Sequence, residues 1–86
     1  MDRILIVEDE PQIAGLLADY FRNDGAEAHV IGNGDLVLPF ITRQPVDAVL
    51  LDIMLPGKDG LTLCREIRQS SDVPILMLTA RVDEID

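Results

Sequence analysis

The residues best placed to do chemistry are acidic, and each follows an unbroken apolar run. Asp52 follows residues 48–51, whereas Glu8 and Asp9 follow residues 4–7. Such a run predicts a strand buried on both faces of a parallel sheet. Because a bare carboxylate is costly to bury, we expect Asp52 at the mouth of its strand, where open α/β sheets bind ligands. Taken alone, Asp52 is equally consistent with a residue that only caps the next turn.

The second acidic group favours a site. The carboxyl ends of parallel strands share one edge of the sheet, so Glu8, Asp9 and Asp52 converge if the first strand lies beside the third. Three carboxylates in one pocket raise one another's pKa values, and a divalent cation relieves that repulsion. Oxygen ligands without Cys or His favour Mg²⁺ over zinc. A carboxylate beside Mg²⁺ can also attack phosphorus and form an aspartyl phosphate, to which the hydroxyl of Thr79 could donate a hydrogen bond.

Strands and helices alternate along the chain and would position these residues. Pro11 and Asp59 each suit a helix start, Asp59 as N-cap, and Gly25 suits a helix end. Between these two helices, another helix follows Asn33-Gly34-Asp35. Because it contains Pro39, we expect this helix to be short or distorted. The order β-α-β-α-β-α-β predicts right-handed crossovers and a doubly wound parallel sheet. The expected strands are residues 3–7, 26–31, 47–55 and 73–78.

Apolar spacing predicts which helical faces are buried. Leu63, Cys64 and Ile67 should face the core from the last helix. The second strand alternates apolar with polar residues, which is typical of a half-exposed edge. On the first helix, the residues expected on one buried face are Ile13, Leu16, Leu17, Tyr20 and Phe21.

Composition limits the classes of function. The chain has 86 residues, enough for one small domain, and carries 7 basic and 16 acidic residues for a net charge of −9. That charge argues against direct binding to nucleic acid or an anionic membrane by this segment. No apolar run reaches the roughly 20 residues of a membrane span, Met1 leads almost directly into the first strand, and Cys64 is the only cysteine. We therefore expect a cytoplasmic protein.

Three motifs resemble the receiver domain of two-component response regulators. They are residues 4–10 (Ile-Leu-Ile-Val-Glu-Asp-Glu), residues 51–60 (Leu-Asp-Ile-Met-Leu-Pro-Gly-Lys-Asp-Gly) and residues 77–81 (Met-Leu-Thr-Ala-Arg). The last two are most similar to the OmpR/PhoB subfamily. Each motif is weak by itself, but three at matching strand ends form a specific pattern, and the likeness runs from Arg3 to Asp86.

The resemblance implies a role for each residue. Asp52 would accept the phosphoryl group, and Thr79 would be the switch hydroxyl. Asp9, Asp52 and the backbone carbonyl of Met54 would bind Mg²⁺ directly, with Glu8 acting mainly through water. The implied fold is flavodoxin-like, with strand order 2-1-3-4-5. The implied partners are a sensor histidine kinase, a second copy of the parent protein and a downstream DNA-binding domain. The module would regulate transcription without being a turnover enzyme.

The chain departs from the family pattern at its C-terminus. Residues 1–86 hold four expected strands and three helices, without the fifth strand and its phosphate-binding lysine, and Lys58 in the turn after the third strand is no replacement. We therefore expect an incomplete receiver. Alternatives are a phosphate-independent pseudo-receiver that binds partners, or an inactive fragment. An aspartyl-phosphate phosphatase would carry a second aspartate two residues after the nucleophile, where this chain has Met54.

Overall fold

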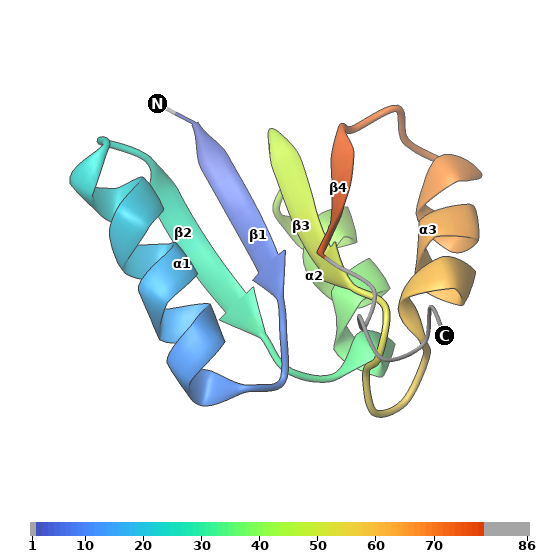
Figure 1. Ribbon diagram of the computed structural model, residues 1–86. Coiled ribbons are helices and arrows are strands. Elements are labelled where there is room, and N and C mark those ends of the chain that lie inside the picture. The colour runs from blue at the N-terminus through green and yellow to red at the C-terminus, as the bar shows by residue number, and fades with distance from the viewer. Residues whose placement is uncertain (1, 79–86) are drawn as a thin grey trace.

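Parallel strands alternate with helices in a computed structural model that describes residues 2–78 (Figure 1). The arrowheads of the strands point to one edge, the lower edge in this view, where the loops leading to the helices begin. The elements are β1 (Arg3–Val7), α1 (Pro11–Asn23), β2 (Glu27–Ile31), the 3₁₀ turn η1 (Gly34–Leu36), α2 (Val37–Arg43), β3 (Ala48–Asp52), α3 (Gly60–Arg68) and β4 (Ile75–Leu78).

The strand order brings the acidic strand ends together. The sheet has the order β2-β1-β3-β4 with parallel pairing, which confirms the doubly wound α/β fold expected from the sequence. Val7 of β1 pairs with Leu51 of β3. The residues that follow this pair are Glu8 and Asp52, so the register alone sets the two carboxylates side by side.

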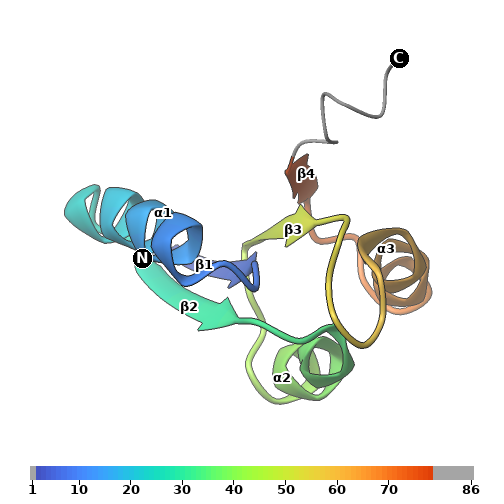
Figure 2. The ribbon, with the colours of Figure 1, turned by 60° about the horizontal axis from the view of Figure 1, so that its bottom comes forward.

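Helices cover both faces of the sheet (Figure 2). Helix α1 lies on one face, and α2 and α3 lie on the other. Alternate strand residues therefore feed two cores, one on each face: Leu5 and Val49 pack with Leu63 of α3, whereas Ile6 and Leu50 pack with Ala18 of α1. Strands β1 and β3 are buried on both faces, and this explains the continuous apolar runs in their sequences.

The buried face expected for α1 is partly wrong. Leu16 and Tyr20 are 72% and 68% exposed, and Ile13 is also exposed. The residues buried against the sheet are the small Ala14 and Ala18, flanked by the partly buried Leu17 and Phe21. Small side chains let the helix lie close to the sheet, so its apolar stripe is wider than its contact with the strands.

Two strand boundaries are also corrected. Strand β3 ends at Asp52 and not at residue 55, because the Asp52 side chain accepts a hydrogen bond from the backbone N–H of Met54 and starts a turn. Strand β4 begins at Ile75 and not at residue 73, since Pro74 has no N–H to give to the ladder.

The expected helix ends are confirmed. Pro11 opens α1 after the capping residue Glu10, and Gly25 follows its end with φ of +91°. Asp59 caps α3 by accepting a hydrogen bond of 2.9 Å from the N–H of Thr62. Helix α2, which contains Pro39, has only 7 residues. Among the helices of residues 2–78, none combines the length and apolarity that crossing a membrane requires.

Candidate functional site

The structure brings Glu8, Asp9 and Asp52 into one acidic cluster. One carboxylate oxygen from each residue lies within 4.8 Å of the others. Glu8 is buried, Asp52 is half-buried and Asp9 is exposed, so the cluster opens to solvent on one side. Its residues come from the carboxyl ends of two neighbouring strands, β1 and β3, as the sequence predicted.

Backbone groups hold the two halves of the cluster. The N–H of Glu8 donates to the carbonyl of Ile31 in β2 at 3.0 Å, and the Glu8 carboxylate accepts from the N–H of Glu10 at 3.0 Å. On the other side, Oδ1 of Asp52 accepts from the N–H of Met54 at 3.2 Å. The bonds from Glu10 and Met54 restrain the carboxylates of Glu8 and Asp52, which lie close to each other in the cluster.

The electrostatics of Glu8 fit a site for a cation. Burial raises the pKa of Glu8, the hydrogen bond from the N–H of Glu10 lowers it, and the neighbouring Asp52 and Asp9 raise it further. The net direction is upward, so the ionised form of Glu8 is disfavoured where it stands. Hard divalent cations such as Mg²⁺ prefer oxygen donors, and the cluster offers three. A bound cation would also offset the repulsion that Asp52 and Asp9 exert on the Glu8 carboxylate.

Replacing Glu8 by Gln should stabilise the protein at neutral pH without divalent cations. The folded-state pKa of Glu8 is raised above its ordinary value of 4.5, so the free energy of unfolding falls as pH rises from 4.5 through the raised pKa. Gln is neutral throughout, and its carbonyl oxygen can still accept from Glu10. We expect a higher melting temperature for Glu8→Gln at pH 7 in a chelator, with the difference from wild type vanishing below about pH 4.

The matched control has the opposite sign. The hydrogen bond from His29 and then that from Arg3 lower the pKa of Glu27, which is a stabilising interaction of the carboxylate. The stability from Glu27 is therefore present above its ordinary pKa and is lost as pH falls through the lowered value. Glu27→Gln should lower the melting temperature at pH 7. Parallel behaviour of the two variants would contradict the assigned environment of Glu8.

The other predicted site residues lie around the cluster or outside the described residues. Met54 follows β3 in the turn beside Asp52, in a shallow hollow that Asp9 and Asp59 also line. The ammonium group of Lys58 forms an ion pair with Glu66 of α3 at 2.6 Å and not with the acidic cluster. Leu78 of β4 pairs with Asp52, and Thr79, the residue after it, lies outside the described residues.

Sequence reasoning missed the residues that fix the loop after Asp52. Gly34 at the start of η1 lies against the backbone of Lys58, and Gly57 lies against the side chains of Asn33 and Asp35, in both cases with no room for a side chain. The sequence signal was present as Asn33-Gly34-Asp35 and Pro56-Gly57, but these patterns predict turns and do not say which turns touch.

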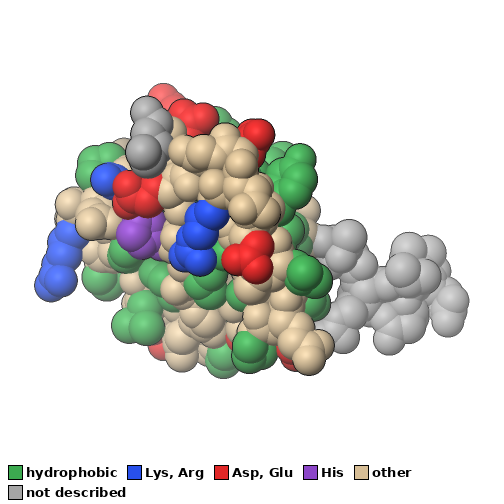
Figure 3. Space-filling model, turned by 90° about the vertical axis from the view of Figure 1, so that its left-hand side faces the viewer, with side chains coloured by type: hydrophobic (Ala, Val, Ile, Leu, Met, Phe, Trp, Pro, Cys, Tyr) green, Lys and Arg blue, Asp and Glu red, His purple; other side chains and the backbone are tan. Residues whose placement is uncertain are grey.

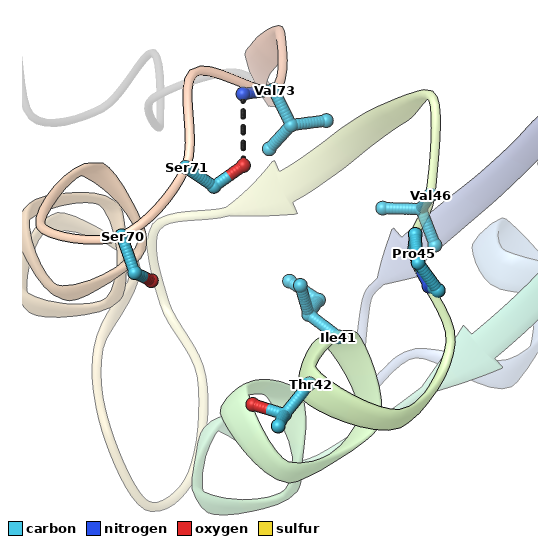
Figure 4. Close-up of a pocket in the computed structure, with 7 residues that line it drawn as sticks. All are labelled: Ile41, Thr42, Pro45, Val46, Ser70, Ser71 and Val73. Carbon is cyan, nitrogen blue, oxygen red and sulfur yellow. Dashed lines mark hydrogen bonds between the residues drawn. The ribbon is translucent and has the colours of Figure 1, made fainter.

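Other surface features offer less chemistry. A second hollow lies at the opposite edge of the sheet, between the ends of α2 and α3 (Figure 4), and none of the residues of the range 2–78 that line it is ionisable. There Ser71 Oγ accepts a hydrogen bond of 3.1 Å from the N–H of Val73. On the side shown in Figure 3, the single histidine lies among acidic and basic side chains, and its ring lies 2.6 Å from the Glu27 carboxylate.

The fold and the acidic cluster are those of a receiver domain, and comparison with known proteins identifies the family. Residues 4–86 match the response regulator receiver domain family. The chain belongs to this family.

Curated relatives extend well beyond this chain. The transcriptional regulatory protein BaeR of Escherichia coli is 58% identical over 84 residues, which are 98% of this chain and 35% of that protein. The DNA-binding response regulator MtrA of Mycolicibacterium smegmatis is 45% identical over 84 residues, 98% of this chain and 37% of that protein. The chain therefore spans little more than a third of the length of these relatives.

A solved structure gives the same fold. The BeF3-activated N-terminal receiver domain of Klebsiella pneumoniae RstA superposes with a TM-score of 0.86 at 40% identity. The match covers 98% of this chain and 74% of that one.

Proposed function

We propose that this chain is a phosphoacceptor module that takes a phosphoryl group from a sensor histidine kinase onto Asp52. The observation that carries the proposal is the convergence of Glu8, Asp9 and Asp52 within 4.8 Å at the carboxyl ends of β1 and β3. The module would in turn control a DNA-binding domain of the same protein, because relatives such as MtrA are named as DNA-binding response regulators.

The proposed metal site uses residues of both strand ends. Asp9 and Asp52 would hold Mg²⁺ directly together with the backbone carbonyl of Met54, and Glu8 would contribute mainly through water. When bound, Mg²⁺ neutralises charge on the phosphoryl oxygens. The three carboxylates supply the hard oxygen donors that this ion prefers.

Asp52 is the proposed nucleophile. Its position at the end of β3 leaves it half-buried, and the N–H of Met54 restrains one of its oxygens. A carboxylate oxygen of Asp52 attacks phosphorus in line, a new P–O bond forms, and the P–N bond to the histidine of the kinase breaks as its imidazole leaves. The product is an acyl phosphate, and Thr79 is proposed to donate its hydroxyl hydrogen bond to the phosphoryl group.

Transfer from a small phosphodonor tests the proposal without a kinase. The full-length protein should become labelled by radioactive acetyl phosphate in the presence of Mg²⁺. In a chelator, labelling should stay near background. The metal dependence follows because three carboxylates without a cation repel the incoming phosphoryl group.

The chemistry of the product gives a second readout. Hydroxylamine cleaves acyl phosphates, so the label should be released by it. Labelling that is equally strong with and without Mg²⁺ would contradict the proposed metal role. A folded wild-type protein that takes up no label would favour a phosphate-independent interaction module.

A further inference from the structure

Residues 31–35 run from the last residue of β2 into η1, and they contact both the Glu8–Asp9 segment and the loop that follows Asp52. We call them the β2–η1 connection. At its start, the carbonyl of Ile31 accepts the hydrogen bond from the N–H of Glu8 at 3.0 Å. A methyl group on Gly32 would be in ordinary van der Waals contact with the backbone of Asp9, 3.6 Å from its Cα, so the connection runs beside this residue. The connection therefore sets the path of the chain that carries Glu8 and Asp9.

At the other end of the connection, Gly34 contacts the loop that follows Asp52. The N–H of Gly34 donates to the carbonyl of Pro56 at 3.0 Å. A side chain at Gly34 would overlap the backbone carbonyl of Lys58 and lie 3.0 Å from its nitrogen. Backbone packs directly on backbone here, an approach that only glycine permits.

A second glycine completes the contact from the other side. Gly57 has φ of +79°, and a side chain on it would meet Oδ1 of Asn33 and lie 2.9 Å from the Asp35 carboxylate. The Asn33 side chain is itself fixed, because its Oδ1 accepts from the N–H of Asp35 at 2.8 Å. The close approach of the two segments thus depends on a glycine in each of them, Gly34 in one and Gly57 in the other.

The loop after Asp52 also packs against the end of β3 where it leads into α3. Gly60 opens α3, and a side chain there would lie 2.5 Å from the backbone oxygen of Asp52. Its N–H also donates to the carbonyl of Ile53 at 2.9 Å. Residues 53–59 are therefore held between the β2–η1 connection and the end of β3, which leaves Met54 little freedom relative to Asp52.

From these contacts we infer that the β2–η1 connection is a positioning element for the acidic site. Ile31 holds the backbone of Glu8 through a hydrogen bond, and Gly32 runs beside Asp9. Asn33 and Gly34 hold the loop that carries Met54, so one short segment sets the distance between the two groups of ligands. Gly34 and Asn33 are positioning residues and not ligands. The inference rests on the proposed function for its consequence, but its geometric part concerns the metal-free protein.

The test is Gly34→Ala in the natural-length protein, read in two ways. In the metal-free protein, backbone amide NMR shifts should change both in residues 53–59 and in residues 8–10, because the connection bridges the two segments. Affinity for Mg²⁺, measured by isothermal titration, should fall by roughly tenfold, as is typical when a residue that orients metal ligands is changed. Asn33→Ala, which removes only the side chain against Gly57, serves if the first variant does not fold.

Two control variants separate positioning from stability. Gly15→Ala adds a methyl group on α1 where no atom lies within 4 Å, so Mg²⁺ affinity and the shifts of residues 8–10 should stay as in wild type. Leu63→Ala lowers stability through the core, and its folded population should keep wild-type Mg²⁺ affinity.

The outcomes distinguish the two proposals. If wild type binds Mg²⁺ and Gly34→Ala (or Asn33→Ala) binds it equally well, with no shift change in residues 8–10, the positioning role is wrong. If wild type binds no Mg²⁺, the proposed metal site fails, while the metal-free shifts still decide whether the connection couples the two segments.

Discussion

Asp52→Asn should reduce labelling by acetyl phosphate to background. An amide nitrogen or oxygen is not a competent nucleophile toward phosphorus, whereas the carboxylate is. The substitution keeps the size of the side chain, and its amide oxygen can still accept the hydrogen bond from Met54. The loss should therefore come without a large change in the melting temperature. Labelling is followed by gel autoradiography in Mg²⁺ at neutral pH.

Asp47→Asn is the matched control at the opposite end of the same strand. Asp47 accepts a hydrogen bond of 2.7 Å from the backbone N–H of Arg3 and serves to hold the start of β3 to β1. Because an asparagine oxygen can accept the same bond, this variant should label like wild type. Persistent labelling of Asp52→Asn, or loss of labelling in Asp47→Asn alone, would contradict the assignment of Asp52.

Leu63→Ala should cause a large loss of stability. Leu63 is fully buried and joins the core between α3 and β3. Truncation of a buried leucine typically costs about 2–5 kcal/mol, because the cavity left behind collapses only in part. Since a small domain has only about 5–15 kcal/mol in total, this is a large fraction. Denaturant titration, followed by the circular dichroism of the receiver, measures the loss.

Leu61→Ala on the same helix is the control. Leu61 is 53% exposed, so its truncation should change the free energy of unfolding by less than about 0.5 kcal/mol. Similar losses in the two variants would show that the inward face of α3 is not the one described.

The fold was predictable where the sequence pattern is continuous. The runs at residues 4–7 and 48–51 form β1 and β3, because strands buried on both faces need apolar residues at every position. The strand order 2-1-3-4-5 came from the family resemblance, and its first four places are confirmed in the described residues. The α1 face was not predictable from periodicity, since burial there depends on how closely Ala14 and Ala18 approach the sheet and not on which residues are most apolar.

The residues of the acidic cluster were predictable from the sequence, but the loops that frame the cluster were not. Residues at carboxyl strand ends meet by topology, so Glu8, Asp9 and Asp52 were identified together from the sequence. The contact of Gly34 with Pro56 and Lys58 was not, because two turns that are distant in sequence meet only after the sheet and helices have assembled. Local turn signals give the conformation of each loop but carry no information on its partner.

The position of the phosphoryl group tests the central claim most directly, because loss of labelling in Asp52→Asn could also reflect a lost metal ligand. Borohydride reduces an acyl phosphate to a primary alcohol and so marks the residue that carried it, which peptide mass spectrometry then locates. After reaction with acetyl phosphate and Mg²⁺, the account predicts one marked residue, Asp52. A mark on Glu8, on Asp9 or on any other residue in place of Asp52 would contradict it.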